Sequence, residues 1–165
     1  MRMHSKLLSL LPMTFMLSSC IFFRDDGSWE KEFGTPELLL ENANSKARVY
    51  LNGEDSKAGA VSYLDEDKAI NQAIKDSGPF AAADERQPGS CRYFTYEANW
   101  VPATSGPNYE RLSIWEDGFV RIHHKTSLGP HVYRYFTMDE AKALALTDFA
   151  FSSVPENADT SFATI

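Results

Sequence analysis

The sequence predicts an α+β fold in which an antiparallel β-meander of about four strands is covered by two or three helices in two layers. An aromatic, β-prone stretch at 91–100 is followed by a hairpin pattern at 109–124 and a strand-like run at 131–136. Helical signals occur at 65–77 and at 138–151. A sheet with one apolar face has to be covered, and these two helices are the available cover.

The N-terminal part of the domain is expected to contain a short helix and two strands. Thr35 is a favoured N-cap residue, and Pro36 suits the first helical position. The sequence becomes polar and helix-poor after Leu40, so this helix should be short. Residues 47–51 and 60–64 have the composition of strands.

A helix over residues 65–77 is indicated by its ends and by its apolar spacing. Asp65 is a candidate N-cap, and Gly78 followed by Pro79 ends the segment. Four apolar residues recur at helical spacing and should form the buried face: Ala69, Ile70, Ala73 and Ile74. Residues 81–90 are polar and are expected to form a loop.

The hairpin at 109–124 has two possible registers. A two-residue Asp-Gly turn would pair Ile114 with Arg121 and would mix polar and apolar side chains on each face. A three-residue loop with Gly118 in a left-handed conformation pairs Ile114 with Val120 and gathers the apolar residues on one face. We expect the second register, because a slip of one residue would reverse every side chain.

The closing helix is expected to begin at a capping box that runs from Thr137 to Glu140 and to end near Phe151. Its candidate core residues are Ala141, Leu144, Leu146, Phe149 and Phe151. The single α+β domain then spans residues 35–152, and residues 153–165 are expected to be a flexible tail.

The charge balance argues against binding to nucleic acid. The 165 residues include 16 Lys and Arg against 23 Asp and Glu, and no basic patch is present. Nucleic-acid affinity depends largely on cationic side chains that neutralise phosphates. The same acidic balance disfavours adsorption to anionic lipid, so electrostatic attraction cannot serve as a membrane anchor.

The N-terminus has the layout of an export signal. Arg2 and Lys6 give a cationic start, residues 7–17 are mostly apolar, and the small residues Ser18 and Ser19 follow. The apolar run is shorter than the roughly 20 residues that a membrane-spanning helix needs.

The tetrapeptide Leu17-Ser18-Ser19-Cys20 resembles the lipobox of bacterial lipoproteins. This resemblance covers the first 20 residues only. It implies that residues 1–19 are a lipoprotein signal peptide, that a diacylglyceryl group is joined to the Cys20 sulfur, and that residues 20–34 are a lipidated tether. More than one acyl chain gives a durable anchor. Ile21 stands where an aspartate would favour the inner membrane of enteric bacteria. The outer membrane is therefore implied in a Gram-negative organism, and the outer face of the plasma membrane otherwise.

Three histidines lie close together in the sequence, but they do not predict a metal site. His123 and His124 are adjacent on a strand and should point to opposite faces, so only one of them can approach His131. Glu110 lies opposite His124 in the expected register and would be the natural third ligand. We interpret these residues as polar strand residues and expect neither a metal nor another cofactor.

No local motif supports an enzyme. The sequence lacks a nucleophile elbow, a phosphate loop, a dinucleotide fingerprint and a zinc-protease helix motif. The acidic groups at 65–67 and at 139–140 lie at expected helix starts, where capping explains them. Cys91 opens a strand-like run and is expected to be buried. We therefore predict no catalytic residue.

Aromatic side chains of the meander are the remaining lead. If the helices cover one face of the sheet, the other face is open to solvent, and aromatic residues are enriched in binding patches. Tyr93, Trp115, Phe119 and Tyr135 could then form an exposed binding surface. The alternative is that these rings fill the core.

Three functions remain open at this point. The first is a membrane-anchored, non-catalytic binding or scaffolding module that meets an envelope protein or a wall polymer through its sheet. The second is an envelope enzyme or metal-binding protein that uses the His123, His124 and His131 region. The third is an immunity-type or inhibitor lipoprotein, whose acidic surface would suit a basic partner.

Overall fold

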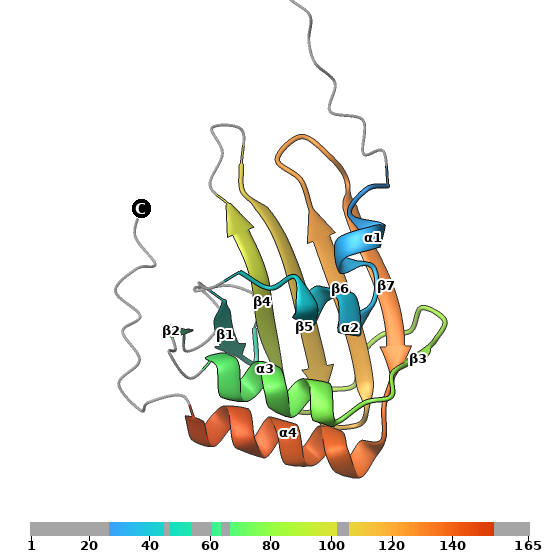
Figure 1. Ribbon diagram of the computed structural model, residues 1–165. Coiled ribbons are helices and arrows are strands. Elements are labelled where there is room, and N and C mark those ends of the chain that lie inside the picture. Colours follow the sequence, from blue (N-terminus) through green and yellow to red (C-terminus); the bar gives the residue numbers. More distant parts are fainter. Residues whose placement is uncertain (1–26, 45–46, 54–60, 64–66, 102–105, 154–165) are drawn as a thin grey trace, which may run out of the picture.

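The computed structural model describes residues 27–44, 47–53, 61–63, 67–101 and 106–153. The expected signal peptide, Cys20, the Asp65 cap and all but the first residue of the expected tail lie outside the described residues. The fold is α+β, and its antiparallel sheet has the strand order β2-β1-β4-β5-β6-β7-β3 (Figure 1). The strands are β1 (Arg48–Leu51), β2 (Val61–Tyr63), β3 (Ala81–Ala82), β4 (Tyr93–Val101), β5 (Asn108–Trp115), β6 (Phe119–Lys125) and β7 (His131–Thr137).

The expected four-stranded meander forms the centre of this sheet. Strands β4, β5, β6 and β7 are neighbours in chain order, and each pair is antiparallel. The sheet is nevertheless larger than predicted, because β1 and β2 extend it beyond β4 and the two-residue strand β3 extends it beyond β7. Strand β3 consists of two alanines, which carry no strand signal in a sequence.

The hairpin between β5 and β6 has the expected register. Ile114 lies opposite Val120, and Leu112 lies opposite Ile122. Gly118 has φ +81°, a left-handed conformation, and its N–H donates to the carbonyl of Trp115 at 3.0 Å. All four paired apolar side chains are therefore on one face, and all four are buried.

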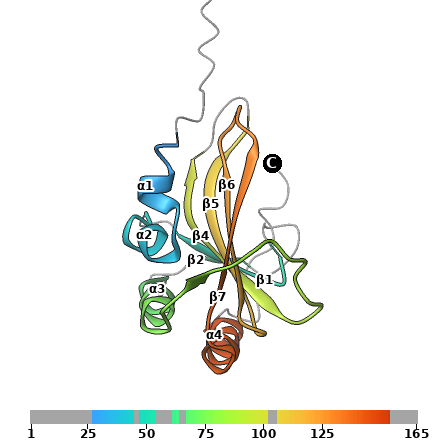
Figure 2. The same ribbon diagram turned by 90° about the vertical axis from the view of Figure 1, so that its right-hand side faces the viewer.

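Four helices lie on the side of the sheet to which these apolar side chains point. They are α1 (Glu30–Phe33), α2 (Pro36–Glu41), α3 (Asp67–Asp76) and α4 (Glu140–Ser153). Figure 2 shows α1, α2 and α3 to one side of the sheet and α4 across its lower end. One hydrophobic core results, and its buried members include Leu39, Leu40, Ile70, Ile74, Phe94, Tyr96, Leu112, Ile114, Ile122 and Leu146.

Helix α1 was not expected from the sequence. Residues 20–34 carry no clear apolar period, yet Trp29 and Phe33 belong to the core. Trp29 stacks on His124 with ring centroids 4.5 Å apart, and Glu30 pairs with Arg134 of β7. The packed structure thus starts nearer the N-terminus than residue 35, because these contacts come from residues distant in the sequence.

The helix caps are partly as expected. Thr35 caps α2, since its hydroxyl accepts a hydrogen bond from Leu38 N at 3.3 Å. The predicted capping box at Thr137 is wrong: Thr137 is the last residue of β7, and the Asp139 carboxylate accepts from Lys142 N at 3.0 Å instead. Asp139 is the better cap because Thr137 is still committed to the strand.

The predicted buried face of α4 is also wrong for most of its residues. Leu146 is buried as expected, but Leu144 and Phe149 are 44% and 38% exposed. Ala141 is exposed as well, and Phe151 is half-buried. The residues that the helix actually buries are Ala143, Leu146, Thr147 and Ala150. Small side chains on this face allow the helix to approach the sheet end closely.

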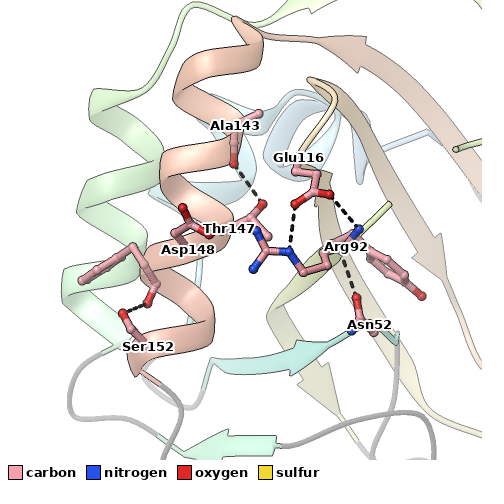
Figure 3. Close-up of polar contacts among 9 residues, drawn as sticks. Asn52, Arg92, Glu116, Ala143, Thr147, Asp148 and Ser152 are labelled. Carbon is pink, nitrogen blue, oxygen red and sulfur yellow. Dashed lines mark hydrogen bonds and ion pairs between the residues drawn. The ribbon is translucent and has the colours of Figure 1, made fainter. Parts of the chain in front are cut away.

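A polar cluster joins α4 to the lower end of the sheet (Figure 3). Arg92 donates to Glu116 at 2.9 Å and to Asp148 of α4 at 2.8 Å. Asn52 accepts from Tyr93 N at 3.2 Å, which ties the end of β1 to the start of β4. Arg92 is exposed, so each of these ion pairs stabilises the fold only slightly.

We expect Gly118→Ala to destabilise the protein by about 2–3 kcal/mol. The left-handed conformation is strained for alanine, and the added Cβ would lie only 2.6 Å from the Met138 carbonyl oxygen. Gly27→Ala is the matched control, because Gly27 has φ +72° and nothing within 4 Å of an added Cβ. Urea unfolding of both variants separates the clash from the backbone effect. If both variants lose the same free energy of unfolding, the contact with Met138 is unimportant.

Candidate functional site

The sheet face opposite the core carries aromatic and charged side chains instead of aliphatic ones. Side chains alternate along a strand, so the neighbours of the core residues point to this second face. None of the described helices lies on it (Figure 2). We call it the polar–aromatic face and define it by Arg48, Tyr50, Tyr93, Thr95, Glu97, Trp100, Tyr109, Arg111, Ser113, Trp115, Phe119, Arg121, His123, His131, Tyr133 and Tyr135.

A buried carboxylate, Glu97, is at the centre of this face. Its side chain is 1% exposed and accepts a hydrogen bond from Arg111 Nε at 2.6 Å. Tyr50 donates its hydroxyl to the other carboxylate oxygen at 3.0 Å, and Arg48 approaches that oxygen at 3.7 Å. Thr95 and Ser113 share a buried hydrogen bond of 2.7 Å beside it. A buried charge persists only when it is paired and hydrogen-bonded in this way.

Burial changes the ionisation of this cluster. It raises the pKa of the Glu97 carboxyl, although Arg111 and Tyr50 act in the opposite direction by stabilising the charged form. Burial also raises the pKa of the Tyr50 hydroxyl, and the negative charge of Glu97 adds to the effect. The Tyr50 hydroxyl is therefore held as a hydrogen-bond donor to the carboxylate.

The four aromatic residues singled out in the sequence lie in one row on this face. Tyr93 stacks on Trp115 with centroids 4.6 Å apart, Trp115 contacts Phe119 at 5.1 Å, and Phe119 stacks on Tyr135 at 6.1 Å. Trp115 and Phe119 are only 3% and 0% exposed, because the row packs on itself and the Arg86 guanidinium lies over Phe119. Solvent reaches the row only at its half-buried ends, Tyr93 and Tyr135.

Three arginines of the face lie over aromatic rings. The Arg121 guanidinium is 5.1 Å from the Trp115 centroid and 5.4 Å from the Tyr133 centroid. Arg111 lies over Tyr109 at 3.7 Å, and Arg48 lies over Trp100 at 4.6 Å. Ring faces attract cations and also hold the planar guanidinium in a fixed orientation. Burial lowers the pKa of Arg121 from its usual value.

The histidines are divided between the two faces, as their adjacency predicts. His124 is in the core face, where its Nδ1 lies 3.0 Å from Glu110 Oε1. His123 is on the polar–aromatic face, where its Nε2 lies 2.8 Å from His131 Nδ1 and 3.5 Å from the Tyr109 hydroxyl. The sheet therefore separates Glu110 from the His123–His131 pair.

The environment of His123 keeps its imidazole neutral. The pKa of His123 is lowered to about 3, mainly by burial and in smaller part by the nearby His131, Arg111 and Arg121. In the described part of the chain, no group of three or more His, Cys, Asp or Glu side chains is placed to hold a metal ion. A groove of about 270 Å³ between α3 and α4 is lined by Ala73, Ser77, Leu146 and Phe149, among others, and contains no histidine.

The accessible part of the polar–aromatic face lies toward β7 and β1. Tyr133 is 39% exposed and His131 is exposed, while Arg121, Arg48 and Trp100 are half-buried. This arrangement offers flat rings beside guanidinium groups that are already oriented. It can bind a ligand with flat apolar surfaces and anionic groups through stacking and bidentate hydrogen bonds.

Sequence reasoning missed the charged members of this face, above all Glu97, Arg111 and Arg121. A sequence signal for their position was present. In each strand these charged residues alternate with core residues and occupy the same alternate positions as the aromatic residues of this face. Cys91, which we expected to be buried, is half-buried just before β4.

Comparisons with protein-family models, with curated proteins and with solved structures found no match to this chain.

We expect the free energy of unfolding to fall as the pH decreases from about 6.5 toward 3, and His123 to contribute to that fall. Its folded-state pKa of about 3 lies below the ordinary value of 6.5, so the unfolded chain binds the proton more readily in this range. The contribution is at most about 1.4 kcal/mol per pH unit.

Urea unfolding at several pH values, compared between the wild-type protein and His123→Gln, measures this contribution. The variant should show a weaker dependence on pH below 6.5. Parallel curves for the two proteins would contradict a neutral, buried His123.

Proposed function

We propose that this chain is a lipid-anchored protein of the cell envelope whose polar–aromatic face binds a wall polymer without catalysing a reaction. The observation that carries the binding proposal is the set of guanidinium groups stacked on aromatic rings, on the sheet face that has no described helix over it.

The anchor is supported by the N-terminal pattern. A cationic start, a short apolar run and Leu17-Ser18-Ser19 directly before Cys20 form the arrangement that lipoprotein processing requires. Among the described residues, no helix is long and apolar enough to cross a bilayer. The proposed location is the outer membrane in a Gram-negative organism and the outer face of the plasma membrane otherwise.

The choice of a wall polymer is supported by chemical complementarity. Wall glycans present sugar rings, whose C–H faces pack on aromatic side chains, and carboxylates, which pair with arginine. On the defined face, the three guanidinium groups of Arg48, Arg111 and Arg121 outnumber two carboxylates. These are Glu97 and Glu85, which is hydrogen-bonded to Tyr135. This local excess of positive charge contrasts with the net charge of −7 of the whole chain.

A catalytic role is less well supported by the geometry. The buried titratable groups Glu97 and His123 are engaged with neighbouring side chains: Glu97 with Arg111, and His123 with the exposed His131. A general base has to reach a substrate proton, and His123, with its pKa near 3, is a poor proton acceptor at neutral pH. The sheet also places His124 on the opposite face from His123 and His131, so the three histidines cannot bind one metal ion together.

Cys20→Ala tests the anchor. We expect the variant to leave the membrane fraction and to accumulate as the unprocessed precursor, because no sulfur is available for the diacylglyceryl group. Ser19→Ala is the matched control, since alanine is also a small residue and should be processed normally. Fractionation and intact mass measure both properties. An unchanged mass and fractionation of Cys20→Ala would refute the anchor.

Tyr133→Ala and Arg121→Ala test the binding face. We expect each to weaken co-sedimentation of the detergent-solubilised protein with purified peptidoglycan by about tenfold, which corresponds to about 1.4 kcal/mol. Binding should also weaken as the salt concentration rises, because the contribution of the arginines is screened.

The control for this experiment is Leu144→Ala, which changes a side chain of similar exposure on α4, at the lower end of the sheet. It should bind as the wild-type protein does. Wild-type protein that does not sediment with peptidoglycan, or variants that sediment equally well, would rule out a wall polymer as the ligand of this face.

A further inference from the structure

Three parts of the sheet lie at the end of the molecule where the described chain begins. In Figures 1 and 2, the end of β4, the start of β5 and the connection between β6 and β7 are at the same end as the start of α1, whereas α4 is at the opposite end. This end is therefore the one closest to Cys20 along the chain. We call it the N-terminal end of the sheet and define it by Val101, residues 106–108 and residues 126–130.

The N-terminal end differs in composition from the rest of this acidic chain. Val101, residues 106–108 and residues 126–130 contain no charged residue, although 24% of the chain is charged. Leu128 is 63% exposed and Val101 is 46% exposed. Pro107 and Pro130 are exposed beside them. These residues carry no negative charge, which anionic lipid would repel, and the adjacent Lys125 ammonium is bonded to loop carbonyls.

The opposite end is rich in charge. Glu116 and Asp117 lie in the β5–β6 turn, and both take part in ion pairs, with Arg92 and Arg86 respectively. Asp148 of α4 also pairs with Arg92 (Figure 3). Insertion of the N-terminal end into a bilayer therefore costs much less free energy than insertion of the α4 end, because charged groups are costly to remove from water.

The loop that carries Leu128 is held in one conformation by its own hydrogen bonds. Lys125 donates its ammonium to the carbonyls of Thr126 and Gly129 at 2.7 and 2.5 Å. Ser127 N donates to Asn108 Oδ1 at 2.5 Å, which connects this loop to the start of β5. The exposure of Leu128 is thus imposed by the loop and is not a consequence of fraying, so little conformational entropy is lost when it inserts into an apolar surface.

The tether limits how far the N-terminal end can be from the membrane. Only six residues, 21–26, lie between the proposed lipidation site Cys20 and the first described residue, Gly27. Such a segment spans at most about 25 Å when fully extended. The lipid bilayer is consequently the surface that this end meets most often.

We propose that the N-terminal end of the sheet is a membrane-contact surface, with Leu128 and Val101 inserted into the interfacial region of the bilayer that holds the lipid anchor. This inference rests on the proposed lipidation of Cys20. With this contact, the long strands β4–β7 extend from the membrane surface into the envelope. The polar–aromatic face is then lateral to the bilayer and remains accessible. The insertion is shallow, within the roughly 5–10 Å that interfacial segments reach.

The test uses the full processed chain in vesicles of phosphatidylcholine and phosphatidylglycerol. Leu128→Cys and Leu144→Cys are each made with Cys91→Ser, so that the introduced thiol is the one available for an environment-sensitive fluorophore. Leu144 is the matched control, an exposed leucine on α4 at the far end. We expect vesicles that contain brominated lipid to quench the label at position 128 by about twofold or more, and to leave the label at position 144 unchanged.

The outcomes separate the two proposals. If the protein floats with the vesicles but the labels at 128 and 144 behave alike, the anchor stands and the membrane-contact surface is refuted. If the processed protein does not float, the anchor itself fails, and the inference fails with it. Quenching of the label at 144 alone would mean that the domain lies on the bilayer through α4, which also refutes the inference.

Discussion

The register of the β5–β6 hairpin is the constraint on which the rest of the structure depends. With Gly118 in a left-handed conformation, Ile114 and Val120 face each other, and every second residue of both strands joins the core. The same register sends Arg111, Ser113 and Arg121 to the other face. A slip of one residue would place guanidinium groups under α1–α3 and aliphatic side chains on the helix-free side.

The second face is stabilised by a different kind of interaction from the first. The core face relies on non-directional apolar burial beneath the helices. On the polar–aromatic face, a central carboxylate holds Arg111 and Tyr50, and stacked rings carry the guanidinium groups. Such contacts depend on orientation, so they fix side-chain geometry more strictly than aliphatic packing does. A face of this kind is both part of the fold and suited to recognise a ligand.

The long axis of the sheet gives the molecule two chemically different ends. The uncharged β6–β7 loop with exposed Leu128 lies where the described chain begins, and the ion pairs of Arg92 lie at the other end with α4. With the lipid proposed at Cys20, the proposed tether, this loop and the strand direction would favour one orientation at a membrane. In that orientation, the proposed binding face is perpendicular to the bilayer and is not hidden by it.

The sequence by itself determined the features that depend on local signals or on strict alternation. These are the α+β class, the central meander, the hairpin register, the Thr35 cap, and the placement of His123 and His124 on opposite faces. The tertiary structure alone decided the rest. Helix α4 is apolar on several sides, so only its neighbours could select Ala143 over Leu144 for burial. Helix α1, strand β3 and the Glu97–Arg111 pair all depend on partners distant in the chain, and no local pattern encodes such contacts.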